Sequence, residues 1–140
     1  MSMLPRPVCQ RLEKAARQAA AKSYSPYSRF KVGAAVLAGS GKIYAGCNVE
    51  NASYGLCNCA ERTAIFSAIA AGERRITAVA VYTPTKALTR PCGACRQVIH
   101  EFGPKATIIS VGQSRARIET TLDVLLPGAF GPKNLKRQKL

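Results

Sequence analysis

Two short segments of this chain carry the side chains that are best suited to chemistry. One is Cys59-Ala60-Glu61, and the other is Cys92-Gly93-Ala94-Cys95, which begins 33 residues after Cys59. Residues three apart on a helix are neighbours, so the thiols of Cys92 and Cys95 can reach one metal ion. Cys59 completes a set of three thiolate ligands if both segments begin helices at the same end of a sheet.

The number of thiolates decides what a bound zinc ion can do. Four cysteines close a tetrahedral site and make it structural, whereas three leave a position for water, whose pKa then falls to about 7. Glu61 lies about 200° round an ideal helix from Cys59, so we expect it across the pocket as a proton carrier. Cys57 is a candidate fourth thiolate, which leaves a purely structural zinc site as an alternative. We interpret Cys57 as a small loop residue.

Three thiolates around Zn²⁺ leave a net charge of −1, which weakens the metal as a Lewis acid. Two features of the sequence counter this charge. All three cysteines are predicted at helix N-termini, where the helix dipole favours anions. Arg62 directly follows Glu61 and is able to donate hydrogen bonds to sulfur, so we predict that it tunes the charge of the zinc site.

The combined pattern C-A-E followed by P-C-x-x-C is the signature of zinc deaminases, including their three-cysteine variant. The chain resembles the small, homotetrameric class of cytidine deaminase from residues 24–30 (YSPYSRF) through 125–132 (LLPGAFGP). The resemblance is densest in three separate stretches, which are 47–54 (CNVENASY), 59–65 (CAERTAI) and 91–97 (PCGACRQ).

The resemblance assigns roles to individual residues. It makes Cys59, Cys92 and Cys95 the ligands of one Zn²⁺ per subunit, and Glu61 the catalytic proton shuttle. Among substrate-binding residues, Phe30 packs on the cytosine ring, and Asn48 and Glu50 bind the sugar hydroxyls. Residues i and i+2 of an extended segment point the same way, which agrees with the last pair. The resemblance further implies that Ala52, Tyr54 and Phe130 contribute to the substrate pocket of a neighbouring subunit.

The implied reaction is hydrolytic deamination of cytidine and deoxycytidine to uridine and deoxyuridine, a step of pyrimidine salvage. Water activated on zinc attacks C4 of cytosine, Glu61 shuttles protons, and ammonia leaves. No organic cofactor is implied. The implied partners are a nucleoside substrate and three further copies of the chain, which form a homotetramer with shared active sites.

The elements that must position these residues follow from the hydrophobic pattern. Apolar residues at helical spacing predict a first helix over 6–22, and β-branched apolar runs predict the central strands. The full set of expected helices is 6–22, 59–71, 92–102 and 121–126, and of strands 31–38, 42–48, 76–83, 106–111 and 117–119. Interleaved helices and strands predict an α/β fold with a mixed sheet covered by helices. The resemblance to cytidine deaminases further implies a three-layer α/β/α, cytidine-deaminase-like fold with a mixed five-stranded sheet.

Length and composition set wider limits. A chain of 140 residues is expected to form one domain, 1–140, with a basic C-terminal tail over about 131–140, and to need no disulfides. No apolar run approaches the roughly 20 residues of a membrane span. The N-terminus lacks a signal core, so we expect a cytoplasmic protein with reduced thiols and no membrane partner.

The formal net charge of +14, from 21 Lys+Arg against 7 Asp+Glu, leaves two further alternatives open. One is a deaminase that acts on cytosine within RNA or single-stranded DNA, which requires an open groove with aromatic stacking. The other is a basic, zinc-stabilised nucleic-acid-binding module without enzymatic activity, which requires four metal ligands. Nucleic acid is the less favoured partner in our interpretation, and the sequence does not discriminate cytidine from deoxycytidine.

Overall fold

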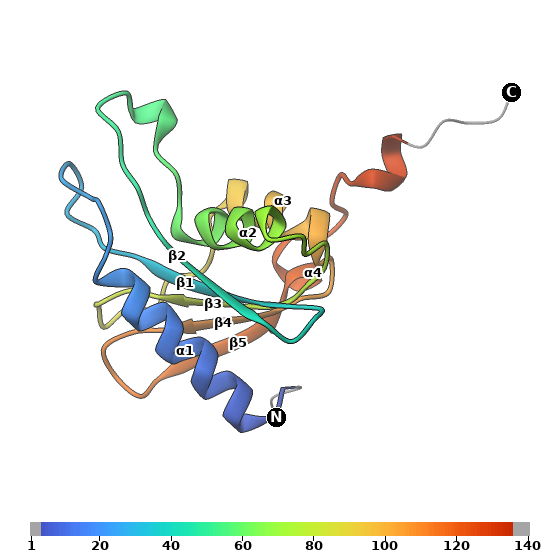
Figure 1. The fold of residues 1–140 in the computed structure, drawn as a ribbon, viewed down its shortest axis with the longest axis horizontal. Coiled ribbons are helices and arrows are strands. Elements are labelled where there is room, and N and C mark those ends of the chain that lie inside the picture. Colours follow the sequence, from blue (N-terminus) through green and yellow to red (C-terminus); the bar gives the residue numbers. More distant parts are fainter. Residues whose placement is uncertain (1–3, 136–140) are drawn as a thin grey trace, which may run out of the picture.

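A five-stranded mixed sheet forms the middle of the molecule, with strand order β2-β1-β3-β4-β5 (Figure 1). The computed structural model describes residues 4–135. Only β3 and β4 are parallel neighbours, and the other pairs are antiparallel. The strands are β1 Gly33–Ala38, β2 Ile43–Cys47, β3 Ile76–Tyr82, β4 Thr107–Val111 and β5 Arg117–Thr121. The expected mixed sheet of five strands is confirmed.

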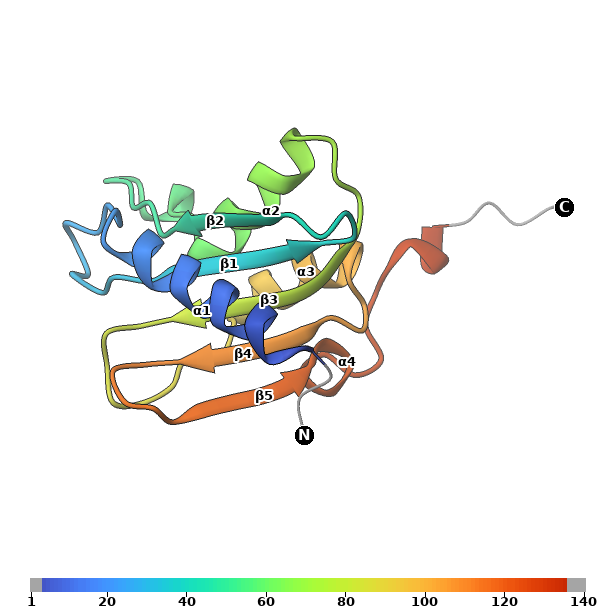
Figure 2. The same cartoon turned by 60° about the horizontal axis from the view of Figure 1, so that its bottom comes forward.

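Helices cover both faces of this sheet, which confirms the three-layer arrangement. The helix α1 (Arg6–Ala20) lies on one face, and α2 (Ala60–Ala70) and α3 (Gly93–Phe102) lie on the other (Figures 1 and 2). The short helix α4 (Leu122–Leu125) follows β5, and the 3₁₀ turns η1 (Tyr54–Leu56) and η2 (Pro132–Leu135) lie outside the layers. Among the described residues, no helix combines the length and apolar character needed to cross a membrane.

Two hydrophobic cores form because successive strand residues face opposite sides of the sheet. In β3, Val79 and Val81 belong to the core beneath α2 and α3, whereas Ala78 and Ala80 belong to the core beneath α1. Both sets are almost fully buried. This double burial explains why the central strands appear in the sequence as continuous apolar runs.

Two glycines permit the helices to approach the sheet closely. A Cβ atom on Gly33 would lie 1.9 Å from the carbonyl oxygen of Ala16 in α1, and one on Gly46 would lie 2.4 Å from the backbone nitrogen of Ala64 in α2. Real Cβ atoms do not approach other atoms so closely. The helix that carries Glu61 can therefore pack closely against β2 because Gly46 has no side chain.

Strand direction brings the chemistry-bearing segments together. Because β2 and β3 are both antiparallel to β1, their carboxyl ends meet at the same edge of the sheet. The segments after β2 and β3 lead to α2 and α3 respectively, so both helices begin at that edge. This is the condition on which the three-thiolate prediction depended.

The element boundaries differ from the sequence expectations in a few places. The first helix ends at Ala20 and not at Lys22, and β5 extends to Thr121 because it pairs with β4 along its whole length. The final helix is shorter than expected and covers only Leu122–Leu125. Of the predicted basic tail, residues 132–135 form η2, and residues 136–140 lie outside the described part of the chain.

Candidate metal centre and substrate pocket

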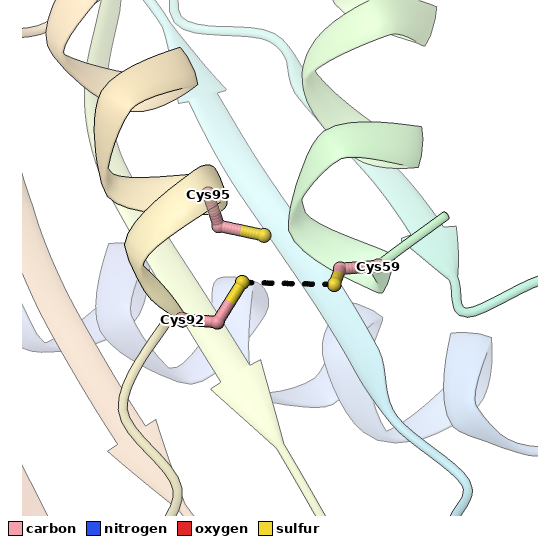
Figure 3. A group of neighbouring side chains, drawn as sticks. All are labelled: Cys59, Cys92 and Cys95. Atoms are coloured by element: carbon pink, nitrogen blue, oxygen red, sulfur yellow. Dashed lines mark hydrogen bonds between the residues drawn. The ribbon is translucent and has the colours of Figure 1, made fainter. Parts of the chain in front are cut away.

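Three cysteine thiols converge at the N-termini of α2 and α3. Cys59 is the N-cap residue of α2 and Cys92 is the N-cap residue of α3, while Cys95 is the third residue of α3. Their Sγ atoms lie within 4.8 Å of one another and point toward a common centre (Figure 3). The Sγ atoms of Cys59 and Cys92 are 3.8 Å apart. The predicted convergence of the three thiols is confirmed.

The geometry and the donor type fit a zinc ion. Zn–S bonds of about 2.3 Å in a tetrahedral shell place two sulfurs about 3.8 Å apart, which matches the separation of Cys59 and Cys92. Thiolates are soft ligands that favour zinc over magnesium or calcium. Among the described residues, no fourth cysteine, histidine or carboxylate joins the cluster, so a zinc ion held here keeps an open coordination position.

Arg62 supplies positive charge beside the sulfurs. Its Nη2 donates a hydrogen bond to Cys59 Sγ at 3.3 Å, and its buried Nε has no hydrogen-bond partner among residues 4–135. Hydrogen bonding from Cys95 and then from Arg62 lowers the pKa of Cys59 to about 5. The hydrogen bond between Cys95 and Cys59, together with burial, raises the pKa of the Cys95 thiol. Cys59 is therefore more readily converted to thiolate than Cys95.

Glu61 lies in the first turn of α2 and lines the same cavity as Cys59 and Cys92. Its relative exposure is 4%, and this burial raises the pKa of its carboxyl group to about 7. A carboxyl group that titrates near neutral pH both accepts and donates protons efficiently. The environment of Glu61 thus suits the proton-carrying role predicted from its offset to Cys59.

A cavity of about 280 Å³ opens beside the thiols. It brings Phe30, Asn48 and Glu50, from two segments distant in sequence, next to the thiols and Glu61. Phe30 is 41% exposed, so its ring belongs to neither hydrophobic core and is available to a planar ligand. The complete lining is Ser28, Phe30, Val32, Asn48, Glu50, Cys57, Asn58, Cys59, Ala60, Glu61, Thr89, Arg90 and Cys92.

Asn48 is held firmly by the loop that precedes β1. Its Oδ1 accepts hydrogen bonds from the Ser23 hydroxyl and from the Val32 backbone N–H, and its Nδ2 donates one to the Phe30 carbonyl oxygen. An amide nitrogen carries two hydrogens. Within residues 4–135 only one of them is used, so the other N–H remains for a ligand. The bonds that Asn48 makes fix the position of Phe30.

Glu50 is oriented by the same loop. Its Oε1 accepts the backbone N–H groups of Tyr27 and Ser28 at 3.0 and 3.1 Å, and its Oε2 accepts the Ser28 hydroxyl. These hydrogen bonds, the Ser28 hydroxyl first, hold the pKa of Glu50 below its usual value. The carboxylate is thus ionised and preorganised to accept hydroxyl groups.

Ala52, Tyr54 and Phe130 do not line the cavity of their own chain. All three are exposed, and Tyr54 packs edge-on against Tyr27 with ring centroids 5.6 Å apart. The Phe130 carbonyl oxygen accepts a hydrogen bond from Gln97 Nε2 at 2.9 Å, which attaches the C-terminal segment to α3.

Cys57 lines the cavity but stands outside the thiol cluster. Its Sγ accepts the Asn51 backbone N–H at 3.3 Å and lies 3.6 Å from the Asn51 carbonyl oxygen. These contacts stabilise the loop between β2 and α2. They agree with the interpretation of Cys57 as a loop residue.

The sequence reasoning missed several residues of the cavity. Ser28 orients Glu50, and Thr89 and Arg90 line the side nearest α3. Only their positions in the sequence could have indicated these residues. Ser28 falls within the aromatic-rich stretch 24–30, and Arg90 directly precedes Pro91-Cys92. Neither residue type by itself indicates a site.

Comparison with known proteins agrees with this geometry. The family model for the cytidine and deoxycytidylate deaminase zinc-binding region matches residues 8–111. The chain is 50% identical over 127 residues to a cytidine deaminase of Halalkalibacterium halodurans, and the aligned region covers 90% of this chain and 96% of that relative. It is 44% identical over 124 residues to a cytidine deaminase of Mycobacterium tuberculosis, covering 89% and 90% respectively.

The fold is likewise similar to solved structures. The crystal structure of a cytidine deaminase from Burkholderia pseudomallei superposes with a TM-score of 0.83 at 49% sequence identity, covering 93% of this chain and 100% of that chain. A Mycobacterium tuberculosis cytidine deaminase structure superposes with a TM-score of 0.76 at 42% identity. The chain therefore shares its overall fold with solved cytidine deaminase structures.

Proposed function

The chain belongs to the cytidine and deoxycytidylate deaminase family, and from this premise we propose that it hydrolyses free cytidine and deoxycytidine to uridine and deoxyuridine. The observation that carries the proposal is the position of Glu61, buried beside three converging thiols in a cavity that also presents an aromatic ring, an amide and a carboxylate. The reaction consumes one water molecule and releases ammonia, as a step of pyrimidine salvage.

Zn²⁺ held by Cys59, Cys92 and Cys95 would supply a Lewis acid that lowers the pKa of water toward about 7. Glu61 is placed to take a proton from the attacking water as its oxygen bonds to C4, and to deliver that proton to N3 of cytosine. Glu61 then transfers the proton of the new C4 hydroxyl to the exocyclic amino group, and the C4–N bond breaks to release ammonia and leave the C4 carbonyl of uracil. The pKa of about 7 supports both transfers, because the group gains and loses a proton at similar cost near neutral pH.

The remaining pocket residues bind and orient the nucleoside. Phe30 packs against the cytosine ring, and Asn48 and Glu50 hold the sugar hydroxyls through the free Asn48 N–H and the preorganised carboxylate. A site with such polar groups discriminates against ligands that lack the matching hydroxyls, because its own groups would then remain unpaired. This arrangement supports a free nucleoside as substrate.

We also propose a homotetramer in which Ala52, Tyr54 and Phe130 complete the pocket of a neighbouring copy. Their exposure in the single chain supports this proposal, as do further large apolar side chains at the surface, among them Leu56 and Val124. Exposed apolar surface is typical of protein interfaces. The cytoplasm is the proposed location, because a thiolate metal site requires reduced cysteines and no disulfide forms between cysteines of residues 4–135.

The test follows the loss of the ultraviolet absorbance of cytidine, and separately of deoxycytidine, with zinc-loaded protein. Glu61→Gln is expected to lower kcat by about 10²- to 10⁴-fold with one zinc still bound per chain. Glu101→Gln is the matched control, since Glu101 is exposed on α3, and its kcat should equal that of the wild type. Absence of turnover with both nucleosides, or loss of zinc in Glu61→Gln, would contradict the proposal.

A further inference from the structure

A second cavity lies on the opposite face of the sheet from α2 and α3, beside α1. It has a volume of about 270 Å³ and is lined by α1 and by the segment from the end of β4 to the start of β5. The helix α1 packs mainly on β1, β2 and β3 and crosses the sheet obliquely (Figure 2). Part of the face formed by β4 and β5 therefore stays open beside the helix.

Arginine dominates the walls of this cavity, which we call the arginine groove. Arg6 and Arg17 come from α1, and Arg115 and Arg117 come from the β4–β5 connection and β5. The one acidic residue in the lining is Glu13, so the groove carries a net formal charge of +3. All four arginine residues are exposed, and each guanidinium offers a planar set of donors that matches phosphate oxygens.

Most of this charge is not neutralised by carboxylates of residues 4–135. Both ion pairs found among residues 4–135 belong to Arg117, which contacts Glu13 at 3.5 Å and Glu119 at 3.2 Å. Arg6 and Arg115 have no carboxylate partner in that part of the chain. Arg17 lies over the Tyr82 ring at 4.7 Å, a contact that orients the guanidinium and leaves its charge uncompensated.

The length of the groove indicates the kind of anion that it fits. Arg6 and Arg17 lie eleven residues apart on one face of α1, which corresponds to about 16 Å along the helix axis. A single phosphate group is too small to contact both residues. A chain of phosphates is able to contact both, and to reach Arg115 and Arg117 on the opposite wall.

We propose that the arginine groove binds the phosphodiester backbone of a nucleic acid, without base recognition and without presenting cytosine to the catalytic cavity. The two cavities share no lining residue and lie on different sides of the sheet. The groove thus gives a physical use to part of the net charge of +14, which hydrolysis of a nucleoside does not require. Backbone binding of this kind loses affinity steeply as salt rises.

The test measures fluorescence anisotropy of a labelled 20-residue oligothymidylate with the zinc-loaded full-length protein across a salt series. This probe contains no cytosine, so catalysis does not interfere. Arg6→Gln/Arg115→Gln is compared with Lys42→Gln/Lys105→Gln, which removes the same charge at exposed positions outside the groove. Arg17 and Arg117 are left intact because they make contacts within the fold. Cytidine turnover and melting temperature confirm that both variants are folded.

The groove variant is expected to bind at least about tenfold more weakly at roughly 50 mM salt, with a log–log salt slope smaller by about 1.4. The lysine variant should stay within about twofold of the wild type. Equal loss in both variants would assign binding to diffuse charge and overturn the proposal. Unchanged binding by the groove variant, or no binding by the wild type, would overturn it as well. Displacement by inorganic tripolyphosphate at equal phosphate concentration would identify a small-anion site instead.

Discussion

The Arg62 guanidinium donates a hydrogen bond to Cys59 Sγ across 3.3 Å, from the third position of the helix that Cys59 caps. The contact places a permanent positive charge against a set of three thiolates whose combined charge exceeds that of one zinc ion. It also spans only one turn of helix, so the Cys59-Ala60-Glu61-Arg62 segment places ligand, proton carrier and counter-charge together.

Arg62→Gln is expected to retain a side-chain donor but to remove the charge. Groups that tune metal ligands typically contribute about 10- to 100-fold to activity or metal affinity, so we expect a decrease of that size in kcat/KM or in zinc affinity. Steady-state kinetics and zinc titration measure the two quantities. Arg74→Gln is the control, because Arg74 is exposed and its side chain bonds the backbone carbonyl oxygens of Ile69 and Glu73. Equal values for Arg62→Gln and the wild type would show that the charge is dispensable.

Ser28→Ala is expected to weaken substrate binding and to change its pH dependence. The Ser28 hydroxyl is the main cause of the lowered Glu50 pKa, so the variant carboxylate becomes protonated at a higher pH. We expect KM to rise by about 3- to 10-fold at neutral pH. The ratio of variant to wild-type kcat/KM should then fall further on acidification.

The ratio of variant to wild-type kcat/KM is the informative quantity for Ser28→Ala. Titration of Glu61 changes kcat/KM equally in both proteins, so its effect cancels in the ratio. Ser40→Ala is the matched control, because the Ser40 hydroxyl donates to Glu73 at 2.6 Å far from the pocket, and its ratio should stay near one. A pH-independent ratio for Ser28→Ala would contradict the proposed link between Ser28 and Glu50.

Cys57→Ala and Cys59→Ala separate a loop cysteine from a ligand two residues away. Cys57 Sγ contacts the Asn51 backbone, so its removal should leave one zinc per chain. Removal of Cys59 takes away one of three converging thiols and should reduce bound zinc well below one per chain. Elemental analysis of the purified proteins measures both. Zinc loss in Cys57→Ala would identify Cys57 as a ligand.

Gly46→Ala is expected to destabilise the fold by pushing α2 away from β2. The new Cβ would lie 2.4 Å from the Ala64 nitrogen and 2.9 Å from the Ala60 carbonyl oxygen, and both atoms are backbone. Overpacking of this kind costs about 1–3 kcal/mol, which lowers Tm by several degrees. Gly55→Ala meets nothing within 4 Å, and its thermal unfolding should match the wild type. Equal Tm values for the two variants would contradict the packing argument.

Mixing two inactive variants tests whether active sites are shared between subunits. Phe130→Ala keeps Glu61, and Glu61→Gln keeps Phe130, so a mixed assembly can contain complete sites if the two residues come from different chains. Random reassembly of equal amounts should restore about a quarter of wild-type activity. Co-refolding followed by a cytidine assay measures it. Activity that stays at the level of the separate variants would place both residues of each site in one chain.

Local spacing explains how much of the site was predictable. The ligand set and the position of Glu61 depend on offsets of two and three residues, and helical geometry converts such offsets directly into directions. The strands β1, β3 and β4 were predictable because they are largely buried on both faces and appear as apolar runs. The ends of elements were less predictable: β5 reaches Thr121 because Thr107 pairs with it, a contact between segments that local sequence does not encode.

The sequence by itself determined the chemistry of the site: three thiolates, a carboxylate two residues after the first, and an arginine beside them. Only the tertiary structure decided that β2 and β3 run in the same direction, that Asn48 keeps one free N–H, and that Phe130 lies outside the cavity of its own chain. It also assembled the arginine groove from residues about a hundred positions apart. The physical reason is that side-chain type and short-range spacing are local properties, whereas strand direction, hydrogen-bond partners and exposure depend on how distant segments pack.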